Sequence, residues 1–169
     1  SGKVKDAERI YNKMRINKSE GGYGFLPNAR AHTTMLNGYE KSLMWSSAVN
    51  LLRKLEQVNI VNNKEDFVPN EIHYNVVLSA CGKCGEWSIA ESIFHSMRTR
   101  DVPTTIITFS TLIAAYGRSG ETLRARCLYN LMRNEGIFPD DYSFVGLILG
   151  HAVKRDLRAA LDVRNLMAS

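Results

Sequence analysis

The amino-acid sequence predicts an all-α protein, a right-handed α-α superhelical solenoid of stacked helix-turn-helix repeats. Three observations support this prediction: apolar residues recur at helical spacing, a small and a large residue recur together along the chain, and no segment alternates as a β-strand does. One helical hairpin cannot bury its apolar face alone, whereas stacked hairpins share a continuous core. The periodicity therefore predicts repeats that pack against one another.

The second half of each repeat is marked by two columns of residues that lie seven positions apart. Seven residues make about two helical turns, so both columns face the same side of one helix. Successive intervals in both columns are 41, 42, 35 and 35 residues. The small column lets a neighbouring helix approach closely. The two columns are Ala7, Ala48, Ala90, Ala125 and Ala160, and Met14, Leu55, Met97, Met132 and Met167.

The first half of each repeat has apolar residues at offsets of 0, 3, 4 and 7. This spacing occurs in 74–81 and in 109–116, and it indicates an amphipathic helix. Gly85 and Gly120 follow these two stretches, where glycine can end a helix in the left-handed conformation. Each repeat is therefore expected to be a hairpin of two helices.

We expect one domain over residues 1–169. It would contain a partial repeat at 4–28, complete repeats at 29–70, 71–105 and 106–140, and a terminal hairpin at 141–169. Extra residues at Asn17 to Leu26 and at Val61 to Val68 fall at the same junction between repeats. We interpret them as surface loops or as a partner-binding edge. Because the chain begins with Ser1-Gly2 and not with methionine, we interpret it as a fragment of a longer protein.

The composition is that of a basic protein without a membrane span. Lys and Arg number 22 against 17 Asp and Glu, and the isoelectric point is about 9.2. A positive balance favours polyanionic partners, although many proteins of similar charge bind none. No apolar run approaches the roughly 18 to 20 residues that cross a bilayer. Three cysteines cannot all pair with one another, which favours a reducing compartment.

No residues are identified as catalytic, metal-binding or cofactor-binding. Cys81 and Cys84 form a C-x-x-C pair, but no second pair with zinc spacing follows, so we interpret both as packing residues. The four histidines are dispersed, and no nucleophile lies near one of them in the sequence. Asp140 and Asp141 fall at a repeat boundary. This segment is therefore not expected to be an enzyme.

Four features together resemble the pentatricopeptide repeat family: the 35-residue period, the first-helix opening, the Ala-x-x-x-Phe/Tyr-x-x-Met second helix and the closing Gly-Ile-x-Pro-Asp. The openings are His73-Tyr74-Asn75 and Thr108-Phe109-Ser110, and the closing motif is Gly136 to Asp140. The resemblance covers nearly the whole chain. The tetratricopeptide family shares the Ala-x-x-x-Phe feature, but its Trp and Leu-Gly signature is missing here, so it ranks second.

The resemblance implies a modular reader of single-stranded RNA, one base per repeat, whose first helices line the concave face. In this family the fifth and last residues of a repeat contact one base edge, and the second residue sandwiches the base. Short hydroxyl and amide side chains suit such contacts. The implied base-reading pairs are Thr33 with Asn70, Asn75 with Thr105, and Ser110 with Asp140.

By the family's pattern these three pairs favour adenine, a pyrimidine and guanine, from 5′ to 3′. Val145, fifth in the last hairpin, cannot form a hydrogen bond and is expected to give no selective contact. Helix capping is the alternative for Thr, Ser and Asn near helix starts, where they satisfy free backbone N–H groups. The implied base-sandwiching residues are Arg30, Ile72, Ile107 and Tyr142.

A cation recurs near the end of each first helix, at Lys41, Lys83 and Arg118. In the resembled family this column lies beside the RNA phosphates, but the helix macrodipole also favours cations at that end. Three reading repeats gain the stacking energy of only a few bases, at about 1 to 3 kcal/mol each. We therefore expect tight binding to require further repeats or a partner.

The implied function is sequence-selective RNA binding in organellar RNA processing, stability, editing or translation, in a mitochondrion or chloroplast, although this segment contains no transit peptide. The implied partners are single-stranded RNA and, through the two insertions, other proteins. No cofactor is implied. Two other classes stay open: a protein-protein scaffold, either tetratricopeptide-like or ribosome-associated, and the RNA-targeting domain of an enzyme whose catalytic domain is absent.

Overall fold

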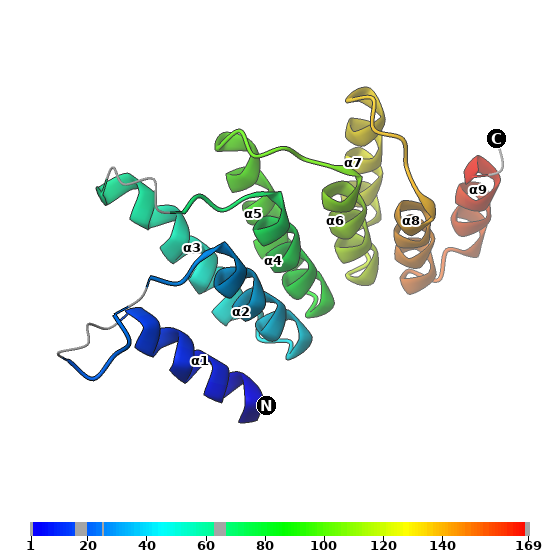
Figure 1. The fold of residues 1–169 in the computed structure, drawn as a ribbon. Helices are drawn as coiled ribbons and strands as arrows, with labels where there is room; N and C mark the ends of the chain where they lie inside the picture. Colours follow the sequence, from blue (N-terminus) through cyan, green and yellow to red (C-terminus); the bar gives the residue numbers. More distant parts are fainter. Residues whose placement is uncertain (1, 16–19, 25, 63–66, 168–169) are drawn as a thin grey trace. The chain divides into compact units, whose positions relative to one another are not determined.

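The structure is a computed structural model that describes residues 2–15, 20–24, 26–62 and 67–167. These ranges contain α-helices and no β-strand, as the periodicity predicts (Figure 1). Each predicted first helix begins where a repeat was expected to begin. The helices are α1 (Gly2–Arg15), α2 (Ala29–Lys41), α3 (Trp45–Asn62), α4 (Glu71–Lys83), α5 (Trp87–Thr99), α6 (Ile106–Arg118), α7 (Thr122–Asn134), α8 (Asp141–Val153) and α9 (Leu157–Met167).

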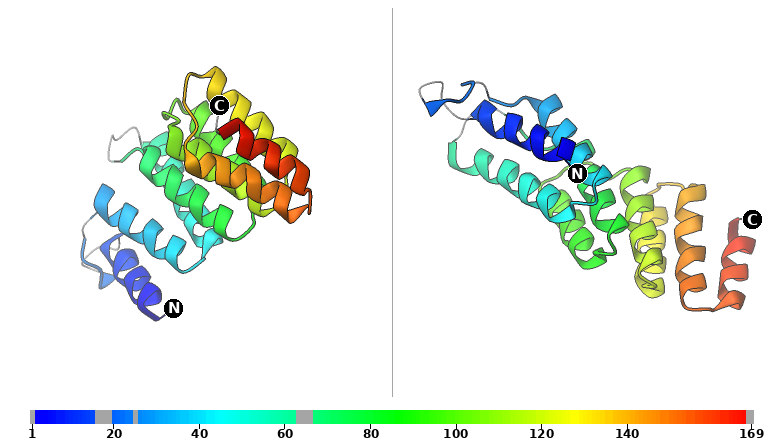
Figure 2. Two further views of the ribbon diagram at one scale, coloured as in Figure 1. Left: turned by 90° about the vertical axis from the view of Figure 1, so that its right-hand side faces the viewer. Right: turned by 90° about the horizontal axis from the view of Figure 1, so that it is seen from below.

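The chain divides into two compact units, Ser1–Ala80 and Cys81–Ser169, which we call unit 1 and unit 2. In unit 1, α2 packs against both α1 and α3. In unit 2, α6 packs against α5, α7 and α8, and α8 packs against α9. Figure 2 shows these packed pairs from two further directions. Each unit therefore consists of neighbouring helices that share their apolar faces.

The turn within each hairpin is closed by one residue in the left-handed conformation. Gly85 and Gly120 have φ values of 78° and 71°, as predicted for a helix end. Leu43 and Arg155 occupy the same place, two residues past the end of a first helix, with φ values of 56° and 60°. Because side chains disfavour this region, these two turns depend on the packing of the helices that they connect.

The core of each unit is built on the two predicted columns. Ala48 is fully buried in unit 1, and Ala90 and Ala125 are fully buried in unit 2. Met97 and Met132 of the large column are fully buried as well. The N-terminal helix α1, which is the second helix of the partial repeat, differs because its column residue Ala7 is exposed. The predicted columns therefore define the core of the complete hairpins but not that of α1.

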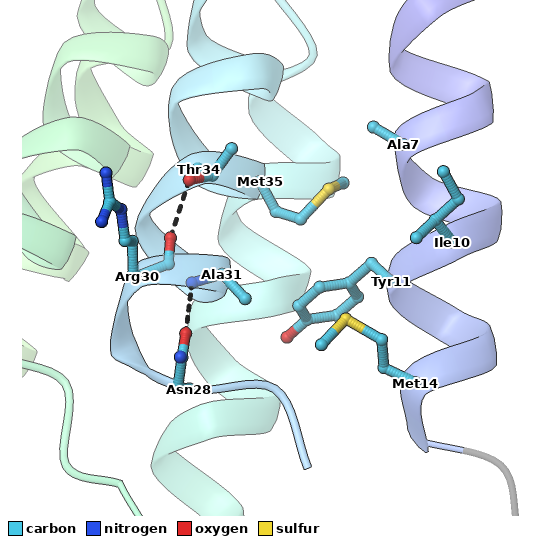
Figure 3. A pocket seen from close by; sticks show the side chains of 9 residues that line it. All are labelled: Ala7, Ile10, Tyr11, Met14, Asn28, Arg30, Ala31, Thr34 and Met35. Carbon is cyan, nitrogen blue, oxygen red and sulfur yellow. Dashed lines mark hydrogen bonds between the residues drawn. The ribbon is translucent and has the colours of Figure 1, made fainter. Parts of the chain in front are cut away.

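An apolar cavity of about 410 Å³ lies between α1 and α2 in unit 1, beside this exposed alanine. Its wall includes Ala7, Tyr11 and Met14 from α1 and Met35 from α2 (Figure 3). In unit 2, α6 packs on both α7 and α8, and there Met132, which corresponds to Met14, is fully buried. In unit 2 the helix α6 fills the corresponding place beside α7 and α8, and in unit 1 the cavity lies there.

The closest helix packing in unit 2 joins α6 to α8 without intervening side chains. A Cβ atom on Gly146 would lie 2.9 Å from the backbone N and Cα atoms of Ala114. A Cβ atom on Gly117 would collide with the backbone carbonyl of Gly146. Both glycines are therefore required by space and not by backbone conformation.

We predict that Gly146→Ala destabilises the chain by about 1 to 3 kcal/mol, since the added methyl forces two helices apart. Gly38→Ala is the matched control. Gly38 also lies inside a first helix, but a Cβ atom there would meet nothing within 4 Å. This control should be neutral or stabilising by up to about 1 kcal/mol. Urea denaturation monitored by circular dichroism measures both changes, and equal stability of the two variants would contradict the close packing.

Candidate nucleic-acid interface

The predicted base-reading residues lie at the starts of the first helices. Thr33 and Ser110 occupy the second turn of α2 and α6, and the last residue of a repeat directly precedes the next first helix. The pair Thr33 and Asn70 lies within unit 1, and the pair Ser110 and Asp140 lies within unit 2. Asn75 and Thr105 belong to different units, so the proximity of that pair stays a prediction.

The two fifth-position hydroxyls form the same hydrogen bond in both units. Thr33 Oγ1 donates to the carbonyl oxygen of Ala29 at 2.9 Å, and Ser110 Oγ donates to that of Ile106 at 2.6 Å. Neither hydroxyl therefore caps a free N–H group, which was the alternative for these residues. Since each proton is used within its own helix, the oxygen lone pairs remain to accept a hydrogen bond. Ser110 is only 3% exposed, whereas Thr33 is partly exposed.

The amide oxygen of Asn75 in α4 is buried and has no hydrogen-bond partner among the described residues. A buried oxygen left unpaired costs about 1 to 3 kcal/mol. Since this oxygen has almost no exposed surface, a donor from outside the chain would reach it only after the side chain turns. The predicted reading residue of the middle repeat is thus the one described side chain with such an unsatisfied buried atom.

The last residue of a repeat caps the first helix of the next one. Thr105 forms a capping box with Thr108, whose hydroxyl accepts from the backbone N–H of Thr105 at 3.1 Å. Asp140 Oδ1 accepts from both the backbone N–H and the hydroxyl of Ser143 at 2.8 Å. Asp140 thus caps α8, a role that the sequence did not predict for it, and at the start of α6 the hydroxyl of Thr108 closes the cap. In Asp140 both bonds fall on Oδ1, so capping does not use the second carboxylate oxygen.

His73 occupies the third position of its repeat, where the next repeats have Thr108 and Ser143. The sequence places His73 in the opening motif of its repeat and among four dispersed histidines, and neither feature predicts its contacts with Thr33 and Asn70. Its side chain is 1% exposed and lies between the two members of a predicted reading pair. Nε2 lies 3.0 Å from Thr33 Oγ1, and Nδ1 is in hydrogen-bond contact with Asn70. Burial lowers the pKa of His73 below its ordinary value, and a hydrogen bond to the Ala29 carbonyl partly offsets the shift.

All four predicted base-sandwiching side chains are exposed on the first turn of a first helix. Ile72, Ile107 and Tyr142 are 52%, 60% and 48% exposed, and Arg30 is also exposed. Large apolar side chains are usually buried in a fold of this kind. Ile72 and Ile107, which are 35 residues apart, therefore leave branched apolar surface on the turn before Asn75 and Ser110, and Tyr142 leaves an exposed ring before Val145.

The three predicted phosphate-binding cations are exposed in the last turns of α2, α4 and α6. Arg118 Nη2 donates to the hydroxyl of Tyr142 at 3.3 Å. In unit 2 a predicted phosphate contact and a predicted sandwiching residue are thus brought together. The same positions suit the helix macrodipole, so the structure is compatible with both interpretations of this column.

The two insertions lie partly outside the described residues, namely at 17–19 and 25 in the first and at 63–66 in the second. The described end of the second insertion faces inward. Phe67 packs between the rings of His32 and His73, at centroid distances of 4.5 and 4.8 Å. A role of the insertions in partner binding stays a prediction.

The described residues form neither a metal site nor a membrane span. Within the ranges that the structure covers, no three ligating side chains are grouped as a metal ion would need. No described helix is both long and apolar enough for a membrane span. Cys81 is buried and Cys84 is partly exposed, and both lie at the end of the first helix of their repeat.

The helical hairpins and the repeated polar positions define a helical-repeat solenoid protein, and comparison with known proteins identifies the family. Profiles described as PPR repeat family match residues 69–116 and 104–153, and a PPR repeat profile matches residues 30–60. These matches include more than half of the chain. The chain therefore belongs to the pentatricopeptide repeat (PPR) family, as its sequence motifs predicted.

Solved structures confirm the fold. PPR10 from maize superimposes with a TM-score of 0.72 at 18% identity, over 96% of this chain and 22% of that one. PPR10 in complex with an 18-nt psaJ RNA element gives a TM-score of 0.75 at 25% identity, over 86% of this chain and 20% of that one. The PPR domain of Arabidopsis thaliana protein-only RNase P 1, in complex with tRNA, gives 0.64 at 22% identity, over 80% of this chain and 68% of that one.

A curated relative is the pentatricopeptide repeat-containing protein At1g18485 of Arabidopsis thaliana. It is 24% identical over 116 residues, which are 69% of this chain and 12% of that protein. This chain thus spans a small part of the length of that protein.

We predict that acid weakens the fold through His73. The unfolded chain takes up a proton near the ordinary pKa of 6.5, whereas the lowered pKa keeps the folded ring neutral, so acid favours unfolding. The free energy of unfolding should be constant above this pH and should fall below it, by at most about 1.4 kcal/mol per pH unit. Urea denaturation between pH 5 and 8 measures the slope, and His73→Thr should reduce it. An unchanged slope in this variant would contradict the buried neutral ring.

Proposed function

We propose that this chain binds single-stranded RNA, one base per repeat, along the starts of its first helices. The observation that supports this most directly is that, in each complete repeat, an exposed side chain suited to stacking lies three residues before a polar reading residue. These pairs are Arg30 with Thr33, Ile72 with Asn75, and Ile107 with Ser110. Stacking on a base is worth about 1 to 3 kcal/mol and needs such a surface. Base edges need the polar atoms.

The chemistry of each pair supports a particular base. In repeat 106–140, Asp140 offers a carboxylate oxygen that only accepts hydrogen bonds. Guanine presents two donors, N1–H and the N2 amino group, on its Watson-Crick edge, so this pair suits guanine. In repeat 71–105, the amide oxygen of Asn75 has no hydrogen-bond partner among the described residues, and it can accept from a donor group of the base. In repeat 29–70, Thr33 with Asn70 follows the family's pattern for adenine.

We propose an affinity that is weak for the chain alone and strengthened by further repeats in a longer protein. Three bases supply only a few kilocalories of stacking before ordering costs are subtracted. This chain is similar to part of PPR10 in a structure that contains an 18-nt psaJ RNA element, over 20% of that protein's length, which supports an RNA partner. We further propose a non-catalytic role in organellar RNA metabolism, in a mitochondrion or chloroplast.

The scaffold alternative is favoured by one observation in unit 2. The second helix α7 exposes Leu123, Cys127 and Leu131 at helical spacing, and these residues line an apolar groove of about 380 Å³ with residues of α5. A protein partner could cover this groove while RNA binds elsewhere. Base preference separates the RNA-binding function from the scaffold function, because a scaffold without base reading would bind all oligonucleotides equally.

We predict that Asp140→Asn changes the preferred third base from guanine to adenine. The substitution keeps the size and the helix cap of the side chain, but it makes the pair like Thr33 with Asn70. The preference between the two bases should shift by about 1 to 3 kcal/mol, as for other good base contacts. Fluorescence anisotropy with short RNAs that contain adenine-pyrimidine-guanine or adenine-pyrimidine-adenine measures it.

Asp156→Asn is the matched control for this substitution. Asp156 also caps a helix, accepting from the backbone N–H of Ala159 at 3.1 Å, and it loses the same charge. It starts a second helix and is not a predicted reading residue. The control should leave base preference unchanged. Identical shifts in both variants would mean that general charge, and not base reading, controls binding.

We predict a salt dependence set by the cationic column. Each phosphate contact contributes about −0.7 to the slope of log affinity against log salt for single strands, so three contacts give about −2. Lys41→Gln should make the slope less negative by about 0.7. Arg126→Gln, which removes an exposed charge from the second helix α7, should change it less. Equal effects of the two variants would favour the macrodipole interpretation of the column.

A further inference from the structure

The start of α8 exposes an apolar side chain at the position where the other first helices have a polar reading residue. Val145, the fifth residue of the terminal hairpin, is 56% exposed. The other three fifth residues are buried or half-buried, namely Thr33, Asn75 and Ser110. Among the four fifth residues, only Val145 is apolar, and only Val145 is exposed.

Tyr142 extends this apolar surface by one helical turn. Residues three positions apart lie on the same face of a helix, so Tyr142 and Val145 share one face of α8. The tyrosine ring is 48% exposed. The two side chains offer a flat ring and a branched apolar group, and their one hydrogen-bonding group is the tyrosine hydroxyl. We call Tyr142 and Val145 the terminal platform.

Contacts with α6 hold the terminal platform in place. Arg118 Nη2 donates to the hydroxyl of Tyr142 at 3.3 Å, which ties the free end of the ring to α6. Gly146, next to Val145, packs directly on α6, where a Cβ atom would lie 2.9 Å from the backbone of Ala114. Because both side chains are already held, little conformational entropy is lost when a ligand covers them.

The chemistry of the terminal platform suits the face of a base and not its edge. Bases of every kind stack on aromatic side chains, and modest preferences among them follow stacking strength. A purine has two fused rings and covers more of the platform than a pyrimidine does. Because Val145 neither donates nor accepts hydrogen bonds, the fifth position offers no group that separates adenine from guanine.

We propose that the terminal platform binds a fourth nucleotide, next to the third base, and selects a purine by stacking, without distinguishing adenine from guanine; this inference rests on the proposed function. The guanidinium of Arg118, held at the edge of the tyrosine ring, adds a positive charge that favours the RNA backbone there. The terminal hairpin thus contributes affinity and a preference for a class of base.

The test measures the affinity of the full chain for a set of short RNAs by fluorescence anisotropy. Each RNA contains adenine-pyrimidine-guanine, followed by adenine, guanine, cytosine, uracil or an abasic site. We expect the two purines to bind equally within about twofold, and roughly three- to tenfold more tightly than the two pyrimidines. The abasic RNA should bind most weakly, since it keeps the phosphate but has no base to stack.

Two substitutions at Tyr142 separate the ring from its hydroxyl. Tyr142→Phe keeps the aromatic face and should retain the purine preference. Tyr142→Ile introduces the residue that the two preceding repeats have at this position, and it should reduce the preference to less than about twofold. Neither variant should change the guanine preference at the third base, which Ser110 and Asp140 would set.

Val145→Thr tests whether the missing hydrogen bond explains the equal binding of the two purines. Ser110 donates to the carbonyl of Ile106, four residues earlier, so an introduced hydroxyl would donate to the carbonyl of Asp141 and offer an acceptor. Adenine has an amino group where guanine has a carbonyl, so it should then bind roughly three- to tenfold more tightly than guanine at the fourth base. Val153→Thr is the matched control, since Val153 is 52% exposed at the other end of α8, and it should leave the purines equal.

The possible results separate the inference from the proposed function. A fourth base without effect, or a wild type that prefers one purine to the other, would overturn the inference. A purine preference that survives in Tyr142→Ile, or that is lost in Tyr142→Phe, would overturn it too. In each of these cases a guanine preference at the third base would leave the proposed function intact. Wild-type chain that binds no RNA, or that shows no preference at any base, would refute the proposed function itself.

Discussion

Every repeat of this chain depends on the same constraint: a hairpin of two helices exposes an apolar face that only a neighbouring hairpin can cover. Fully buried alanines at Ala48, Ala90 and Ala125 show where the covering helix approaches. Because the neighbours are alike, any residue at a given position recurs in the same surroundings in the next repeat. The polar positions at the helix starts are repeated for this reason, and the proposed binding of one base per repeat rests on that regularity.

In the proposed function, the residues that recognise bases also have a structural role. A last residue such as Asp140 uses one carboxylate oxygen to cap the next helix and keeps the other. A fifth residue such as Ser110 gives its proton to its own helix and keeps its lone pairs. Capping therefore places the reading atoms, and the two interpretations of these residue types describe different atoms of one side chain.

Sequence periodicity predicted the fold because the residues that neighbouring hairpins bury recur along the chain. Helix starts and glycine turns are local features, and the buried columns repeat. The predicted reading positions were likewise found at helix starts. The bridge from His73 to Thr33 was not predicted, since it depends on how α2 and α4 are aligned and on Phe67 from an insertion without periodicity. The exposure of Ala7 also escaped prediction, because the column shows a small residue but not what covers it.

The glycine contact between α6 and α8 has a consequence for any strand that lies across unit 2. Interaxial distances of packed helices depend on the side chains at the crossing, and a crossing made by Gly117 and Gly146 is at the short end of that range. Helices that touch through their backbones cannot move closer. In the proposed RNA complex, the distance between these two helices would therefore set the step between neighbouring nucleotides, and the flexible sugar-phosphate chain would adjust to it.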